Sequence, residues 1–259
     1  MKLYLYVDGD SVLHRLDPRP KLLSVIAVIL LAVSAEHPAL PAALQALALL
    51  GIAVAGAWSS LRRVRALLVV ITGFSVLVWT LLSRGATPLV GFVALESVLF
   101  GLSTGLKLSA TITASVVWLA TTRNEEIAAG LIRMGVPYRM AFAFSAALRM
   151  VPTFVGAGAT IIEAQRARGL DVERGGPVRR MRNYLPMMVP VFAAALRSAH
   201  QMAMALEAKG FGAQPKRTYL LQLRMHGADW LAVGLAAAAA AASVWIAAGG
   251  YGRLPGLYR

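Results

Sequence analysis

Two places in the sequence set a cation directly before a glycine, each at the end of a long helical pattern. Ala167-Arg168-Gly169 closes a pattern that starts at Tyr138, and Ala208-Lys209-Gly210 closes one that starts at Val178. Glycine tolerates the left-handed conformation that ends many helices, and a cation there complements the helix dipole. Either run alone is explained as an ordinary helix end. Two matched runs, both after a Glu and both in a basic region beside membrane spans, are less readily explained as helix ends alone.

The residue patterns of common catalytic and metal sites are missing from the sequence. It contains no Gly-x-x-x-x-Gly-Lys-Ser/Thr phosphate-binding loop, so ATP would have to be hydrolysed by another chain. The four histidines, His14, His37, His200 and His226, are scattered without ligand spacing, and cysteine is absent. We therefore expect no catalytic residue, no metal site and no cofactor in this chain.

The composition indicates an integral membrane protein. Of its 259 residues, 58% are hydrophobic and only 15% are charged, whereas soluble proteins have roughly 25% charged residues. The net charge is +14, and the block from Arg123 to Arg224 holds fifteen Lys or Arg against six Asp or Glu. Cytoplasmic loops of membrane proteins are rich in cations. The excess therefore needs no nucleic acid to explain it, and we expect the bilayer as a partner instead.

Apolar runs predict an all-α integral membrane protein with about five transmembrane helices. The runs cover residues 22–35, 39–58, 66–82, 98–122 and 229–248. The first run is shorter than the roughly 20 residues that a span needs, so flanking residues must complete it. Asp17 and Pro18, just before it, are typical of a helix start. Lys107, in the fourth run, either snorkels to the interface or makes a buried polar contact.

The cations also predict the orientation in the membrane. Arg62, Arg63 and Arg65 follow the second run, and the basic block follows the fourth. Because cations favour the cytoplasmic side, we predict a multi-pass protein of the inner (cytoplasmic) cell membrane. Its N-terminus would lie in the cytoplasm and its C-terminus outside.

The segment 123–228 departs from the pattern of simple spans. A short helix is expected after a cap at Asn124, and Pro137 enforces its end. Pro152 should kink or split the first long pattern, and Pro190, with Pro186, the second. Helices that mix apolar and charged residues lie along a membrane more readily than they cross it. We therefore divide the chain into a leader with four spans (1–122), a cytoplasmic coupling-helix region (123–228), and a last span with an outside tail (229–259).

Several motifs between Gly105 and Gly212 occur together in a known family. They are Leu131-Ile132-Arg133-Met134-Gly135-Val136-Pro137, Leu148-Arg149-Met150-Val151-Pro152, Glu163-Ala164-Gln165-Arg166-Ala167-Arg168-Gly169, Pro190, Leu196-Arg197 and Ala205-Leu206-Glu207-Ala208-Lys209-Gly210-Phe211-Gly212. With these motifs and the opening His14-Arg15-Leu16-Asp17-Pro18-Arg19, the chain resembles the transmembrane (T) component of energy-coupling factor transporters. These transporters are ATP-driven importers of vitamins and metals. The resemblance covers most of the chain.

The resemblance implies partners and the residues that bind them. Two coupling helices would end at Ala167-Arg168-Gly169 and Ala208-Lys209-Gly210, and each end would dock in a groove on one of two ATPase subunits. ATP and magnesium would belong to those ATPases, and a small membrane (S) subunit would bind the substrate. Lys209 stands where the family has arginine, so the charge is kept but the planar five-donor fork is lost. The positions expected to support coupling are Pro137, Arg149, Pro152, Glu163, Pro190, Arg197 and Glu207.

Some alternatives stay open on the sequence alone. Arg149 beside Pro152 is either a buried anchor at a kink or a snorkelling side chain. A conventional ABC importer permease is a second hypothesis, because Glu126-Ile127-Ala128-Ala129-Gly130 faintly resembles a permease coupling loop. A membrane-bound enzyme is a third, but Glu96 is the only acid between Glu36 and Arg123. The substrate, whether biotin, another vitamin or a transition metal, is not predicted.

Overall fold

The chain is almost entirely helical in its computed structural model, which describes residues 6–82, 88–90, 93–169, 176–213, 223 and 225–249. The helices are α1 (Val12–Arg15), α2 (Pro18–Ser34), α3 (Ala39–Ala55), α4 (Trp58–Leu82), α5 (Leu95–Thr121), α6 (Asn124–Arg133), α7 (Tyr138–Ala167), α8 (Pro177–Ala208) and α9 (Gly227–Gly249). Two very short strands, β1 (Pro88–Val90) and β2 (Val93–Ala94), pair antiparallel before α5. The predicted all-α membrane fold is confirmed.

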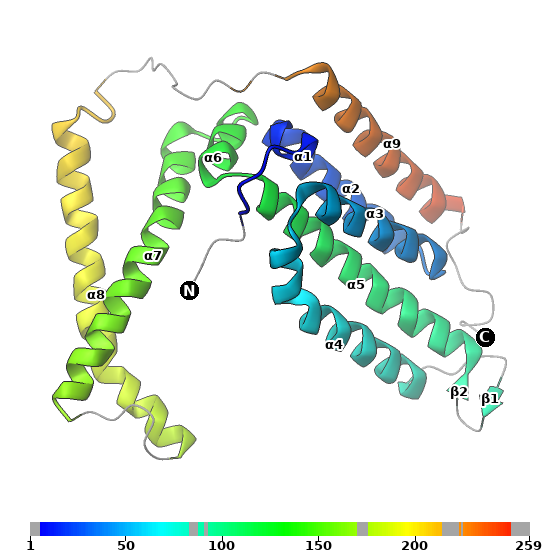
Figure 1. Ribbon diagram of the computed structural model, residues 1–259, viewed down its shortest axis with the longest axis horizontal. Coiled ribbons are helices and arrows are strands. Elements are labelled where there is room, and N and C mark those ends of the chain that lie inside the picture. The colour runs from blue at the N-terminus through cyan, green and yellow to red at the C-terminus, as the bar shows by residue number, and fades with distance from the viewer. Residues whose placement is uncertain are drawn as a thin grey trace. The chain divides into compact units, whose positions relative to one another are not determined.

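The chain folds into two compact units (Figure 1). The first unit combines residues 1–136 with residues 223–259, and the second consists of residues 137–222. The short helix α6 therefore belongs to the first unit, and the second unit is inserted between α6 and α9. The domain boundaries that we place at residues 122 and 228 concern the membrane topology, and they stay a prediction.

Within the described residues, four helices are long and apolar enough to cross a bilayer, namely α4, α5, α7 and α9. The apolar helix α3 is shorter, and α2 also has only 17 residues. By length and composition α7 could cross the membrane. Its mixture of apolar and charged residues predicts instead that it lies along the membrane, and this placement stays a prediction. The third expected span differs from the structure, because α4 starts at Trp58 rather than near Ala66. Its first turns include Arg62, Arg63 and Arg65, and arginine is a good helix former.

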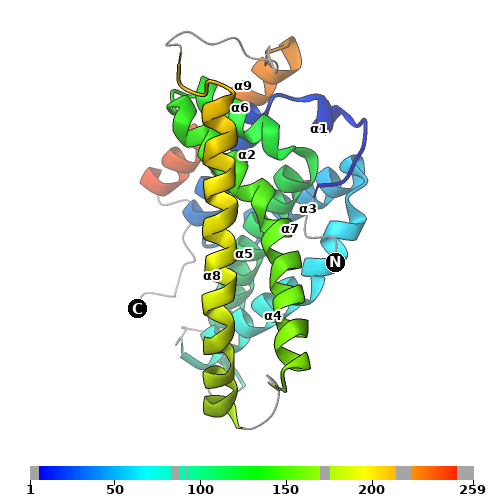
Figure 2. The same ribbon diagram turned by 90° about the vertical axis from the view of Figure 1, so that its left-hand side faces the viewer.

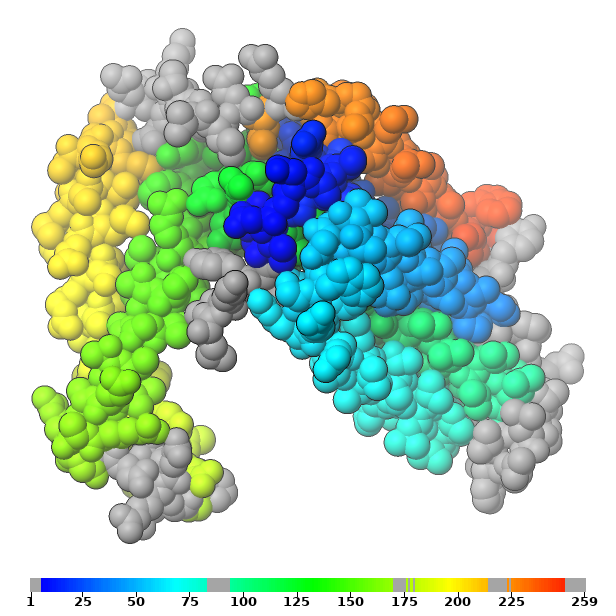
Figure 3. All heavy atoms as spheres, in the orientation of Figure 1, coloured from blue at the N-terminus to red at the C-terminus, as the bar shows by residue number. Residues whose placement is uncertain are grey.

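The centre of the first unit is α5, which packs against α2, α3 and α4. A Cβ atom on Gly101 would lie 2.9 Å from Val76 Cα, and one on Gly105 would lie 2.8 Å from Thr72 Cα. Only glycine lets the backbones of α4 and α5 come this close. The space-filling view in Figure 3 shows the two helices in direct contact. Ser75 Oγ adds a hydrogen bond to the Gly101 carbonyl oxygen at 3.0 Å.

The last helix is fastened to the first long one by a buried carboxylate. Asp229, at the start of α9, is 1% exposed. Its Oδ1 accepts the Asp17 backbone N–H at 2.8 Å and its Oδ2 accepts the His226 backbone N–H at 2.7 Å. Asp17 is in turn the N-cap of α2, where it accepts the Arg19 backbone N–H at 3.1 Å. The predicted cap at Asp17 is confirmed, and the backbone N–H of the same residue joins α2 to α9 through Asp229, 212 residues away.

The start of α6 differs from the prediction in one residue. Arg123, not Asn124, is the N-cap, and its backbone N–H donates to Glu126 Oε2 at 3.1 Å. The Arg123 Nε donates to the Tyr6 hydroxyl at 2.9 Å, and its guanidinium lies 5.4 Å from the centre of the Tyr6 ring. This hydrogen bond raises the pKa of Arg123 above its usual value. An extended backbone at residue 123 and an acid three residues later provide one half of a capping box, because the arginine side chain has no acceptor for the other half.

The second unit consists of α7 and α8, which run in opposite directions and cross (Figures 1 and 2). Both helices continue through their prolines, Pro152 in α7 and Pro186 and Pro190 in α8. Of the two expected outcomes, a kink or a split, the split does not occur, because a proline removes one backbone hydrogen bond while the rest of a long helix is kept. Figure 1 shows α8 bent toward its N-terminal end, which contains both of its prolines.

Candidate functional site: two cationic helix ends

The C-terminus of α7 is a left-handed glycine stop. Arg168 is the C-cap, with φ −84° and ψ 5°, and Gly169 follows with φ +89°. The Arg168 N–H bonds to the Gln165 carbonyl oxygen at 3.1 Å, and the Gly169 N–H bonds to that of Arg166 at 2.9 Å. These bonds hold the last turn closed and leave the Arg168 side chain exposed.

The C-terminus of α8 repeats this geometry and extends it. Lys209 is the C-cap, with φ −88° and ψ 6°, and Gly210 has φ +69°. The Gly210 N–H bonds to the Glu207 carbonyl oxygen at 2.9 Å, and the Phe211 N–H bonds to that of Leu206 at 2.9 Å. This pair of bonds defines the Schellman motif. The helix end is therefore fixed for one residue beyond the glycine.

An aromatic cluster ties the second end to the start of α7. The Phe211 ring centre lies 5.7 Å from that of Tyr138 and 4.7 Å from that of Phe142. Tyr138 is the first residue of α7, whereas Arg168 follows the last. Since α7 has 30 residues, and a helix rises about 1.5 Å per residue, the two cations are separated by on the order of 45 Å. Figure 2 shows the two helices along their length.

The charge of each end is available to a partner. Arg168 and Lys209 are both exposed, and neither forms an ion pair with any residue in the part of the chain that the structure describes. The exposed last carbonyl groups of a helix carry a partial negative charge that favours a nearby cation. The site therefore presents two fixed positive charges, each on a short, well-capped protrusion, and an acidic groove on another protein is its natural complement.

Comparison with known proteins gives the family. The cobalt transport protein family, CbiQ, matches residues 9–220. The chain belongs to this family. It is 32% identical to an energy-coupling factor transporter transmembrane protein, EcfT, of Thermosediminibacter oceani, over 90% of this chain and 93% of the relative. It is 31% identical to the EcfT of Limosilactobacillus fermentum, over 89% and 91% of the two chains. The EcfT of Brevibacillus brevis is 32% identical over 86% and 89%. The resemblance to the T component is thus confirmed, and the chain is a transmembrane component of a transporter.

The other positions expected to support coupling are spread along the second unit. Pro137 is the N-cap of α7 and follows Gly135, whose φ is +98°. Exposed side chains are those of Pro137, Arg149, Glu163, Arg197 and Glu207, and partly buried ones are those of Pro152 and Pro190. Arg149 is thus not a buried anchor within this chain, although it has an interaction partner. Only Glu163 and Glu207 come within about a turn of a cationic end, and their supporting roles stay a prediction.

The sequence analysis missed three features, and two of them had a signal. A packing role for Phe211 could have been found, because an apolar residue directly after the stop glycine is part of the Schellman motif, although the rings that it meets in α7 could not. The close contact of α4 and α5 could also have been found, since Gly101 and Gly105 form a Gly-x-x-x-Gly pattern in an apolar run. The hydrogen bond from Asp17 to Asp229 had no such signal, because neither local sequence indicates that the two residues are in contact.

Proposed function

We propose that this chain couples two ATPase subunits to a small substrate-binding membrane (S) subunit in an ATP-driven importer. The observation that carries the proposal is the pair of exposed cationic helix ends at opposite ends of α7. A separation on the order of 45 Å is too large for one groove to hold both cations. It suits two ATPase subunits, each of which receives one helix end. Movement of the ATPases would then be transmitted along α7 and α8.

The proposal assigns ATP and magnesium to the ATPases. This chain has no phosphate-binding loop in its sequence, so its part is to bind and move rather than to catalyse. The substrate would bind to the S subunit. We propose a vitamin or a transition-metal ion as the substrate, and the description of the matching family as a cobalt transport protein makes Co²⁺ one candidate.

An apolar stripe on α8 supports contact with the S subunit or with lipid. Its exposed members are Met181, Leu185, Met188, Phe192 and Leu196, which are 77%, 63%, 65%, 66% and 55% exposed. Spacings of three and four residues place them along one side of the helix. We propose that the second unit lies on the cytoplasmic face of the inner membrane, with the chain's N-terminus on the same side, and that this stripe faces the S subunit.

The alternative of a conventional permease is disfavoured by the position of its expected coupling loop. Ile127, Ala128 and Gly130 are buried in α6. A Cβ atom on Gly130 would lie 3.0 Å from Pro18 Cγ, so α6 packs tightly against α2 within the first unit. A loop that docks on an ATPase needs an exposed apolar face, and the residues that would form it here are already covered.

Copurification with charge-reversed variants tests the proposal. The complex is purified through a tag on this chain, with Arg168→Glu and Lys209→Glu combined. We expect the ATPases to be lost while the S subunit stays, because a reversed charge in a docking groove costs about 2–5 kcal/mol per contact. Arg182→Glu is the matched control, since Arg182 is an exposed cation of α8 away from its C-terminal end. Recovery of both ATPases at the unmodified ratio with the double variant would refute the proposal.

A further inference from the structure

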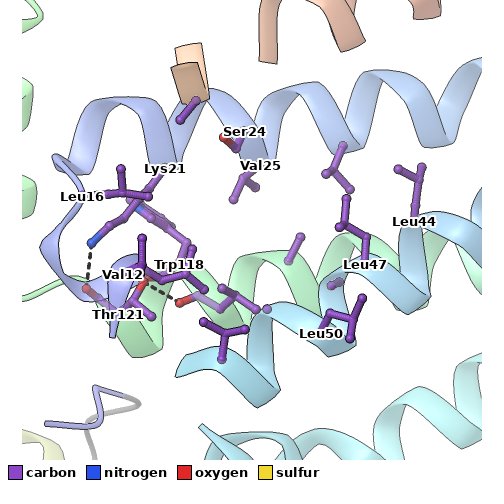
Figure 4. A pocket seen from close by; sticks show the side chains of 18 residues that line it. Val12, Leu16, Lys21, Ser24, Val25, Leu44, Leu47, Leu50, Trp118 and Thr121 are labelled. Carbon is purple, nitrogen blue, oxygen red and sulfur yellow. Dashed lines mark hydrogen bonds between the residues drawn. The ribbon is translucent and has the colours of Figure 1, made fainter. Parts of the chain in front are cut away.

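An apolar pocket of about 420 Å³ lies within the first unit, between α1, α2, α3 and α5 (Figure 4). Its walls include Val25 and Val28 from α2, Leu44 from α3 and Val117 from α5. Leu47, Leu50 and Val54 also line it and are 61%, 62% and 56% exposed, so the pocket opens on the outer surface of α3. The chain is an integral membrane protein, and an apolar opening on such a helix faces lipid acyl chains.

One end of the pocket carries hydrogen-bond donors without enough acceptors. Lys21 lines this end and is 7% exposed. Its Nζ donates to the Thr121 carbonyl oxygen at 2.9 Å and to that of His14 at 3.3 Å, whereas an ammonium group has three donors. The buried Nε1 of Trp118 has no hydrogen-bond partner among the residues that the structure describes. Figure 4 shows Lys21, Trp118 and Thr121 together at this end. Buried donors without acceptors are costly, so the end is suited to a ligand with oxygen acceptors.

We propose that this pocket binds one acyl chain of an anionic phospholipid, with an ester or phosphate oxygen accepting from Lys21 and Trp118. The apolar walls match the acyl chain, and the ammonium group at one end matches the negative headgroup. A volume of about 420 Å³ is typical of a small-molecule pocket. It is too small for a helix of another subunit, which is about 10 Å across.

The polar end also defines which leaflet supplies the lipid. Lys21 lies in the first turns of α2, and the topology proposed above puts that end on the cytoplasmic side. The lipid would then come from the inner leaflet. This assignment of the leaflet rests on the proposed topology, whereas the pocket and its donors do not depend on docking of the ATPases.

Quenching of Trp118 fluorescence tests the proposal. The other tryptophans, Trp58, Trp79, Trp230 and Trp245, are changed to phenylalanine in the full chain, which is purified in detergent without its partner subunits so that the emission comes from Trp118. The sample is titrated with phosphatidylglycerol brominated on its acyl chains, because bromine quenches a nearby indole. We expect quenching that saturates at one lipid per chain. Phosphatidylcholine brominated in the same way should bind about fivefold more weakly, since it lacks the net negative charge that Lys21 attracts.

Pocket-filling variants make the test specific. Ala114→Phe narrows the pocket from α5 and should abolish the saturable quenching, whereas Ala53→Phe, at an exposed position of α3 that does not line the pocket, should leave it unchanged. Ser24→Leu, which narrows the pocket from α2, serves if Ala114→Phe fails to fold. Quenching that rises without saturation and is unaffected by either variant would show bulk lipid only and overturn the proposal. Loss of the S subunit from the complex of a variant that still binds the brominated lipid would also overturn it, since the pocket would then be a protein contact.

Discussion

The two cationic helix ends share one backbone geometry but are anchored differently. Arg168 and Lys209 have nearly the same φ and ψ, and each precedes a glycine with positive φ. The α8 end has the Schellman bond of Phe211 and its packing on Tyr138 and Phe142, whereas the described part of the α7 end, which stops at Gly169, has hydrogen bonds within its own last turn. The helix α7 thus carries one cation at its end and supports the other at its start, so both proposed ATPase contacts would depend on it.

Removal of the aromatic anchor, the Phe211 ring, is expected to cause the largest difference in ATPase binding between the two helix ends. Phe211→Ala deletes two ring contacts, each worth about 0.5–1.5 kcal/mol beyond the area that it buries. We expect ATPase binding through the Lys209 end to weaken, while binding through Arg168 is unchanged. The measurement is photo-crosslinking to the ATPases from a cysteine next to each cation. Phe144→Ala, which removes an exposed ring of α7, is the control. Equal losses at both ends would show that Phe211 supports the whole second unit rather than one end.

The stop glycines of the two helix ends differ in their φ angles. Gly169 has φ +89°, outside the usual left-handed range, whereas Gly210 has φ +69°. A side chain in this region costs roughly 1–3 kcal/mol, so we expect Gly169→Ala to destabilise its helix end more than Gly210→Ala. Faster hydrogen exchange of the amides in the last turn would report the loss. Gly→Asn at the same positions should be milder, because asparagine tolerates the left-handed conformation. The reverse order of the two alanine variants would contradict this account.

The smallest effect is expected from exchanging the two cations. Arg168→Lys removes a planar fork that can bind a carboxylate with two hydrogen bonds, whereas Lys209→Arg adds one. We expect Arg168→Lys to weaken ATPase binding by about 1 kcal/mol and Lys209→Arg to leave it unchanged or slightly tighter. Titration of the purified ATPases onto the reconstituted membrane complex measures both. If Lys209→Arg weakens binding as much as Arg168→Lys, the α8 groove is shaped for lysine.

Local features of the fold were predictable from the sequence, and long-range ones were not. Both helix ends, the Asp17 cap and the helices near the five apolar runs follow from nearby residues, because glycine, aspartate and apolar periodicity act within a few positions. The bond from Asp17 to Asp229 depends on how α9 packs, which no local pattern specifies. The same holds for the aromatic cluster, in which Phe211 meets a ring 73 residues earlier only because α7 and α8 are antiparallel.

The helices α7 and α8 continue through their prolines, so the low helix propensity of proline is overridden there by the surrounding helix. Each proline lowers the local preference for a helix, yet the helical segments on both sides of it stay joined in one helix, and α8 bends within this helix (Figure 1). The cap of α6 is a second case in which local propensity fails. Asparagine is the better capping residue, but Arg123, the residue before it, has the extended backbone that a cap requires. Sequence rules thus identified the right segments and the starts of α2 and α7, but not the cap of α6 or the continuity of α7 and α8 through their prolines.

The central claim is that the two helix ends contact two different ATPase subunits. Ala167 and Ala208 are exposed neighbours of the two cations, and the chain has no cysteine of its own. A chain with Ala167→Cys and Ala208→Cys, both labelled with a photo-crosslinker, is assembled with the ATPases and irradiated. The account predicts a covalent product of one chain with two ATPase copies, and products with one copy from each single variant. If the double variant yields only products with one ATPase copy while both single variants crosslink efficiently, both ends contact the same subunit and the account is wrong.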